Sequence, residues 1–340
     1  MAIDASSDFV IPTIDIAPYV ANPASAAAAQ VIADVRHACM TTGFFSLVGH
    51  DVPAELQQRV LQAARLLFAL PLEAKLALRP AGILKSRGYE LIGSQALQPE
   101  TLPDMKEGYY VGRHVPADDP CVSLHPHFVG ENIFPPTSVI ASADLREPLE
   151  EYHAAALSLS RTVLDILARG LPYGDDVFAE FTSNDPLCSV RMLHYPPTNE
   201  SPTSASPKQL GAGAHTDFGA ITLLYQDDKG GLEVLDQATD TWVPVVPNPA
   251  AYIVNVGDML SLWTRGAYRS NLHRVINYSG TDRYSLPFFF DGNLDTKLIP
   301  LGTEDEPAGD VLTVQDHMLE RLGTTFERAE RQKQTVTASV

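Results

Sequence analysis

The chain has 340 residues, of which 45% are hydrophobic and 8% aromatic, enough to bury a substantial core in one or two domains. Its 24 basic and 42 acidic residues give a net charge of -18, which disfavours nucleic acid and anionic membranes as partners. The N-terminal segment lacks a signal-peptide pattern, and no segment approaches about 18 uninterrupted apolar residues. We therefore expect a cytoplasmic protein that is not held by a membrane, and we infer no obligate protein partner.

The N-terminal third is predicted to combine helices with a buried strand. The alanine run at 26–29 continues with apolar residues at helical spacing and ends at Gly43, as a helix with a glycine stop does. Three further elements follow along the chain: a buried strand over 44–48, an amphipathic helix over 54–68 and a short helix over 72–78.

The middle of the chain changes from helix to strand. Apolar residues recur every three or four positions from Leu145 to Ile166 and stop before Gly170, which predicts a long helix with one face on the core. From about Cys188 to Asp291, short runs of aliphatic and aromatic residues alternate with Gly, Pro, Asn and Asp, which is typical of an antiparallel all-β region. Eight such strands in two facing sheets predict a mainly β fold with flanking helices, built on a double-stranded β-helix (jelly roll) core.

Three polar or C-terminal segments complete the chain. They are a predicted surface loop over 198–213, an acidic loop over 304–310, and a closing helix over 311–329 with Val314, Met318, Leu322 and Phe326 along one side. Because no linker is evident, we expect one structural unit. Its parts are an N-terminal helical and strand region (1–120), a bracing-helix region (121–185), the jelly-roll core with the site (186–300), and the C-terminal helix and tail (301–340).

A candidate metal site lies in the strand-rich region. His215 and Asp217 are two residues apart, and side chains with that spacing project from the same face of a strand, with Thr216 turned away. His273, from another strand, would complete a set of two histidines and one carboxylate. Such a set leaves coordination positions open to small molecules and favours non-haem Fe(II). A catalytic zinc with the same ligands stays open, whereas structural zinc prefers four closed ligands, often thiolates.

Ten residues beyond His273, the chain repeats the same spacing with different chemistry. Arg283 and Ser285 would present a planar guanidinium and a hydroxyl on one strand face, a combination that suits a carboxylate. A zinc site would give no reason for this pair.

The order and spacing of these residues resemble the isopenicillin N synthase-like branch of the Fe(II)/2-oxoglutarate-dependent dioxygenases. The resemblance covers roughly residues 9 to 330 and is weakest after residue 330. Eight further segments match the branch in content and order: IPTIDI (11–16), TTGFFSLVGHDVP (41–53), LFALPLEAK (67–75), SRGYE (86–90), DMKEGYYVG (104–112), MLHYPP (192–197), GGLEV (230–234) and VNVGD (254–258).

This resemblance implies an oxidoreductase that uses Fe(II), molecular oxygen and 2-oxoglutarate as co-substrate. His215, Asp217 and His273 would hold the metal, and no catalytic group beyond these ligands is expected. Arg283 and Ser285 would grip the distal carboxylate of 2-oxoglutarate, and Tyr195 matches a family tyrosine that also hydrogen-bonds it. The implied reaction couples decarboxylation of 2-oxoglutarate to hydroxylation, desaturation or ring closure of a small organic substrate, which we expect to be a secondary metabolite.

Candidate substrate residues follow from the same comparison. Tyr110, Phe218, Phe289 and Asp291 match positions that line the substrate cavity in relatives, and Phe289 and Asp291 share strand parity with Arg283. Core packing is the alternative for the two phenylalanines. Two departures weaken the transfer of a flavonoid substrate. Leu193 stands where many plant members carry asparagine, and Gly108 replaces a bulkier residue.

Two other functions stay open at this stage. Isopenicillin N synthase and aminocyclopropane-carboxylate oxidase share the ligands and the arginine–serine pair without using 2-oxoglutarate, so a co-substrate-free iron oxidase fits the same residues. A non-catalytic metal-binding protein also fits, although it would not need an intact anion clamp.

Overall fold

The computed structural model describes residues 9–80, 86–99, 101–198, 209–303 and 311–323. Two sheets form its centre. The larger sheet has eight strands, in the spatial order β1 (Thr13–Asp15), β2 (Phe44–Val48), β10 (Tyr252–Val256), β7 (Ile221–Gln226), β12 (Arg283–Gly292), β5 (Leu187–Tyr195), β4 (Glu107–Gly112) and β3 (Gly88–Glu90). The smaller sheet has four, in the order β6 (Ala212–His215), β11 (His273–Val275), β8 (Leu232–Asp236) and β9 (Thr241–Pro244).

The predicted jelly roll is confirmed. Strands β5 to β12 all lie between Leu187 and Gly292 and divide between the two sheets. The N-terminal region adds four strands that extend the larger sheet on both edges. Strand β2, for example, pairs antiparallel with β10, about 200 residues further along the chain.

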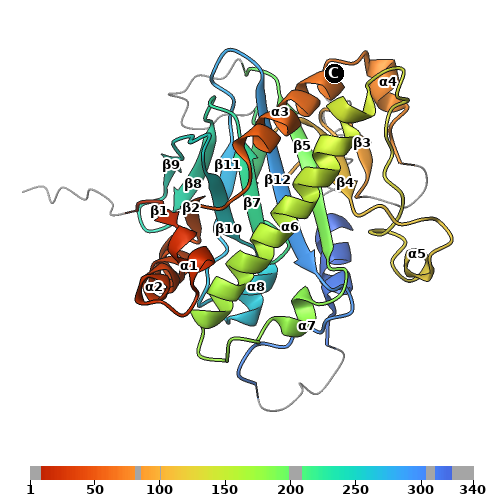
Figure 1. Cartoon of the computed structure of the whole chain (residues 1–340). Coiled ribbons are helices and arrows are strands. Elements are labelled where there is room, and N and C mark those ends of the chain that lie inside the picture. Colours follow the sequence, from red (N-terminus) through yellow and green to blue (C-terminus); the bar gives the residue numbers. More distant parts are fainter. Residues whose placement is uncertain (1–8, 81–85, 100, 199–208, 304–310, 324–340) are drawn as a thin grey trace, which may run out of the picture.

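Helices cover one face of the larger sheet and its ends (Figure 1). They are α1 (Ala17–Ala21), α2 (Ala26–Thr41), α3 (Ala54–Phe68), α4 (Leu72–Leu76), α5 (Pro120–Leu124), the short 3-10 helix η1 (Ser142–Asp144), α6 (Arg146–Arg169), α7 (Ala179–Thr182) and α8 (Asp258–Trp263). The predicted helices at 26–43, 54–68 and 72–78 correspond to α2, α3 and α4. Gly43 ends α2 as predicted, since its φ of 73° is readily adopted only without a side chain.

The long helix α6 lies across the larger sheet beside α3, as Figure 1 shows. The predicted apolar stripe is its buried face, with Leu149, Tyr152 and Ala156 fully shielded from solvent. Because strand side chains alternate, Val190 and Met192 of β5 belong to the same apolar core as this stripe. Ser189 and Arg191 of β5 therefore point to the opposite, inner face, where the cavities lie.

Three predictions for the outer segments need correction or lie outside the described residues. The loop predicted over 198–213 ends at Gly211, because Ala212 already begins β6, and its residues 199–208 are not described. The closing helix begins at 314 rather than 311, because Thr313 and Asp316 cap it with reciprocal hydrogen bonds. It is described to residue 323, so Phe326 and the acidic loop 304–310 fall outside.

No helix among the described residues is both long and apolar enough to cross a membrane. The division of the chain into four parts stays a prediction.

Candidate metal centre and its two cavities

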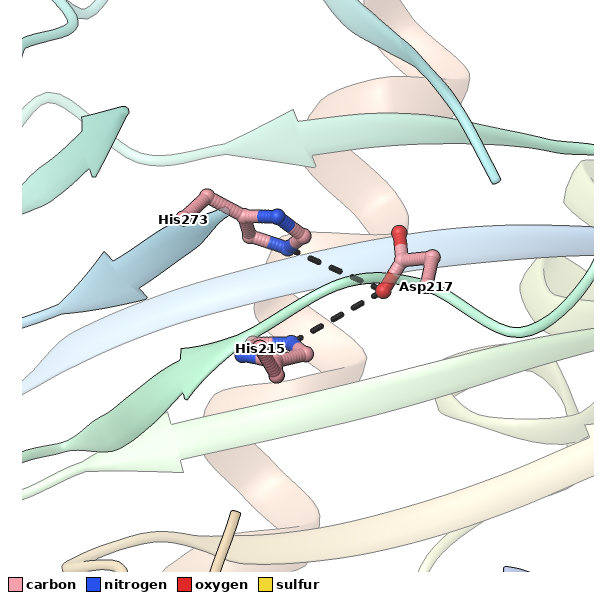
Figure 2. A group of neighbouring side chains, drawn as sticks. All are labelled: His215, Asp217 and His273. Atoms are coloured by element: carbon pink, nitrogen blue, oxygen red, sulfur yellow. Dashed lines mark ion pairs between the residues drawn. The ribbon is translucent and has the colours of Figure 1, made fainter. Parts of the chain in front are cut away.

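Two histidines face each other across the smaller sheet. Strands β6 and β11 pair antiparallel with His273 directly opposite His215, so the two imidazole ring centres lie 4.2 Å apart. The Nε2 atom of each ring is 3.7 Å from Oδ1 of Asp217, which points between them (Figure 2). The sequence prediction that these three side chains converge is confirmed.

The prediction that Asp217 shares a strand with His215 is wrong. Strand β6 ends at His215, and Asp217 lies in the irregular segment that follows, where its backbone carbonyl accepts a hydrogen bond from the Asp258 amide at 2.8 Å. The β6–β11 ladder has a β-bulge between His273 and Val275, opposite the segment of β6 that precedes His215, and His215 is the last residue of β6 that pairs. Thr216 does turn away as expected, since its hydroxyl donates to Asp258 at 3.0 Å.

The larger sheet orients the carboxylate. Oδ2 of Asp217 accepts hydrogen bonds from the Thr222 hydroxyl on β7 at 2.5 Å and from the Asn255 amide on β10 at 2.8 Å. These bonds leave Oδ1 directed toward the histidines. A carboxylate oriented in this way is typical of metal sites, in which surrounding donors fix the ligand.

Backbone carbonyls fix the histidines in the form that binds metal. The Gly213 carbonyl lies 2.7 Å from Nδ1 of His215, and the Asn271 carbonyl lies 3.3 Å from Nδ1 of His273. Since a carbonyl can only accept, Nδ1 carries the proton in both rings and Nε2 keeps its lone pair.

Electrostatics agree with this assignment. Burial and the neighbouring His273 lower the pKa of His215 to about 3. Burial opposes ionisation of Asp217, but His273, His215 and the two hydrogen-bond donors outweigh it and hold the pKa of Asp217 below its usual range. Two neutral imidazoles and one carboxylate are the donor set that suits Fe(II).

A buried guanidinium lies elsewhere on the inner face of the larger sheet. Arg283 is fully buried, its Nε donates to the Gly230 carbonyl at 2.5 Å, and its Nη2 donates to Oε1 of Gln226 at 2.6 Å. Within the described part of the chain, Nη1 has no hydrogen-bond partner and the guanidinium forms no ion pair. An uncompensated buried cation is costly, so this arrangement is suited to an anionic ligand.

A cavity, here called the clamp cavity, connects this guanidinium to the metal centre. Its walls include all six residues predicted for metal and co-substrate: His215, Asp217, His273, Arg283, Ser285 and Tyr195. The guanidinium carbon of Arg283 stacks 4.8 Å from the ring centre of Tyr195. Leu193, noted above as a departure from plant members, also lines this cavity and adds an apolar surface.

A second cavity, here called the outer cavity, begins at the same centre, because His215 and Asp217 line both. All four predicted substrate residues lie in its wall: Tyr110, Phe218, Phe289 and Asp291. Phe289 belongs to neither apolar core cluster, whereas Phe218 also packs against the main core. Met318 and Leu322 of the C-terminal helix also line the outer cavity. Burial raises the pKa of Asp291 to about 7, and the neighbouring carboxylate of Asp217 contributes to this shift.

Two charged residues of this site were not predicted. Arg191 lines both cavities, forms an ion pair with Glu90, and donates to Gln95 at 2.8 Å. Lys106 is buried in the clamp cavity and pairs with Asp104. Strand parity was the available signal, because Arg191 is four residues before Tyr195 and therefore shares its face.

Gly108, the other noted departure, has a structural reason. A Cβ atom at this position would lie 3.0 Å from Oε2 of Glu90 and 3.1 Å from Nε of Arg191. The missing side chain therefore makes room for the buried ion pair beside the two cavities.

Comparisons with known proteins agree with this geometry. Residues 11–137 match the family model "non-haem dioxygenase in morphine synthesis N-terminal", and residues 186–292 match "2OG-Fe(II) oxygenase superfamily". The chain is 51% identical over 328 residues to the 2-oxoglutarate-dependent dioxygenase citB of Monascus ruber, covering 96% of this chain and 98% of the relative. It is 42% identical over 337 residues to the clavatol oxidase claD of Penicillium crustosum, covering 96% and 99%.

Solved structures show the same architecture. A Neurospora crassa protein in complex with alpha-KG (2-oxoglutarate) superposes with a TM-score of 0.79 at 25% identity, covering 94% of this chain and 97% of that one. A putative 2OG-Fe(II) oxygenase family protein from Caulobacter crescentus superposes with a TM-score of 0.75 at 27% identity, covering 93% and 99%.

Proposed function

The chain belongs to the 2OG-Fe(II) oxygenase superfamily, and from this premise we propose which of its residues bind the metal, the co-substrate and the substrate. It is an oxidoreductase that uses Fe(II), 2-oxoglutarate and molecular oxygen to oxidise a small organic molecule. His215, Asp217 and His273 hold Fe(II) through the two Nε2 atoms and Oδ1. Bound there, Fe(II) supplies the redox chemistry that couples decarboxylation of 2-oxoglutarate to oxidation of the substrate.

Arg283 and Ser285 bind the distal carboxylate of 2-oxoglutarate in the clamp cavity, and Tyr195 adds a hydroxyl beside them. The observation that carries this assignment is the unpaired Nη1 atom of a fully buried arginine in a cavity that also reaches the metal ligands. The carboxylate compensates the buried charge, so the co-substrate is held at one end by the arginine and at the other by the metal.

The substrate occupies the outer cavity, in contact with Tyr110, Phe218, Phe289 and Asp291. Because His215 and Asp217 line both cavities, a metal held by them would face both, and a substrate carbon in the outer cavity would lie beside it. Similarity to a clavatol oxidase supports a secondary metabolite as the substrate.

The setting of the reaction follows from composition. A net charge of -18 supports an enzyme that works apart from nucleic acid and anionic membrane surfaces, and we propose the cytoplasm as its location and no obligate protein partner.

The test is the substitution Arg283→Lys, which keeps the charge but loses the planar fork of donors. We expect the apparent KM for 2-oxoglutarate in succinate formation to rise by about tenfold or more, since hydrogen bonds to charged groups contribute about 1.5–3 kcal/mol. Iron content should stay at the wild-type level. The control is Arg59→Lys, at an exposed ion pair with Glu151, which should change neither value. An unchanged KM in the Arg283 variant would remove this residue from the co-substrate site.

A further inference from the structure

The outer cavity contains an uncompensated acidic group. Asp291 is only 5% exposed, and within the described part of the chain its carboxyl group forms no hydrogen bond or ion pair. It lies on β12 two residues after Phe289, on the strand face that lines the cavity. A buried carboxyl without a partner either takes up a proton or is compensated by a hydrogen-bond donor of the molecule bound beside it.

The backbone makes room for this carboxyl group next to the metal centre. A Cβ atom at Gly219 would lie 2.1 Å from Oδ1 of Asp291. Gly219 is two residues after the proposed ligand Asp217 and lines the same cavity. The absent side chain therefore allows the carboxyl group to sit at the end of the cavity where oxidation takes place.

The other charges around this cavity restrict what the partner can be. Arg191 is already neutralised by Glu90, so it does not compensate Asp291. A cationic substrate would be repelled by the divalent metal, and an anionic one by the carboxylate of Asp291. A neutral molecule with a hydrogen-bond donor, such as a hydroxyl group, satisfies Asp291 without either penalty.

The remaining wall describes the rest of the molecule. Aromatic side chains surround the cavity, namely Tyr110, Phe128, Phe218 and Phe289, with Leu97, Leu187, Met318 and Leu322 between them. Such surfaces favour a flat aromatic ring.

We propose that the substrate is a neutral hydroxylated aromatic molecule, and that Asp291 is the specificity-determining residue that accepts a hydrogen bond from its hydroxyl group. This inference rests on the function proposed above.

The test uses three ring compounds of one frame, namely orcinol, the difluoro analogue in which fluorine replaces each hydroxyl, and α-resorcylate, in which a carboxylate replaces the methyl group. Binding to the enzyme loaded with Fe(II) and 2-oxoglutarate is measured by anaerobic calorimetry. We expect orcinol to bind about tenfold or more tightly than the difluoro analogue, because a hydrogen bond to a charged group is lost. We expect α-resorcylate to bind more weakly than orcinol.

Two variants assign this preference to Asp291. Asp291→Ala removes the acceptor, and Gly219→Ala keeps the carboxylate but displaces it, so each should reduce the preference for orcinol to about twofold or less. The control is Asp295→Asn, which removes a nearby exposed acid that pairs with His125 outside the cavity and should keep the wild-type preference.

The inference is overturned if orcinol does not bind, if it binds no more tightly than its difluoro analogue, or if its binding is unchanged in Asp291→Ala. Preferred binding of α-resorcylate would overturn it as well. Succinate formation from 2-oxoglutarate is measured in the same preparations. If succinate forms while the preference is absent, only this inference fails. If no succinate forms with any preparation, the proposed function fails with it.

Discussion

Asn255 offers a sharp test of how the larger sheet controls the metal centre. Its amide donates to Oδ2 of Asp217 at 2.8 Å, and the Thr222 hydroxyl donates to the same oxygen. The variant Asn255→Ala removes one of these two bonds. A hydrogen bond to a charged group contributes about 1.5–3 kcal/mol, and loss of such a supporting donor typically lowers metal affinity by about 10-fold to 100-fold. We expect a loss of Fe(II) affinity in this range.

The assay is an anaerobic Fe(II) titration with a competing chelator, together with the urea unfolding of the metal-free protein. The control is Asn132→Ala, which removes an amide side chain that makes two hydrogen bonds to the backbone of Gly112, away from the proposed ligands. Both variants should lose stability, but only Asn255→Ala should lose iron affinity. The proposed role of Asn255 would be refuted if Asn255→Ala bound Fe(II) as tightly as the wild-type protein while losing as much free energy of unfolding as Asn132→Ala.

Two further predictions concern the ligands and the opposite face of the sheet. Asp217→Ala removes the charged ligand, so iron binding and succinate formation should both be lost, and full activity would exclude the proposed metal site. Burial opposes protonation of His194, but Glu107 and Asp282 outweigh it and raise its pKa above 6.5 in the folded protein. The stabilisation that this shift provides is complete below pH 6.5 and is lost as the pH rises through the folded pKa. The free energy of unfolding should therefore fall over that window, and urea unfolding of His194→Gln should show a flatter pH dependence; an equally steep decline in the variant would contradict this origin.

Much of the site could be predicted because it follows strand parity. Arg283, Ser285, Phe289 and Asp291 lie on one strand at even spacing, and the sheet does place them on one face. The long helix α6 was equally predictable, because its apolar stripe repeats with helical periodicity over the whole element.

The features that sequence reasoning missed depend on contacts between distant segments. After β6 ends at His215, the backbone carbonyl of Asp217 accepts a hydrogen bond from Asp258, about forty residues further along the chain. The pairing of β2 with β10 likewise leaves no local pattern. Arg191 and Lys106 were missed because charged residues are usually exposed, whereas here Glu90 and Asp104 neutralise them in the interior.

The central claim is that the clamp cavity holds 2-oxoglutarate against Fe(II) bound by His215, Asp217 and His273. The most direct test is an anaerobic titration of the Fe(II)-loaded protein with 2-oxoglutarate, monitored by the visible charge-transfer absorption that arises on chelation. The account predicts a saturable band in the wild-type protein and a weaker apparent affinity in Arg283→Lys. Absence of the band while iron remains bound would contradict it.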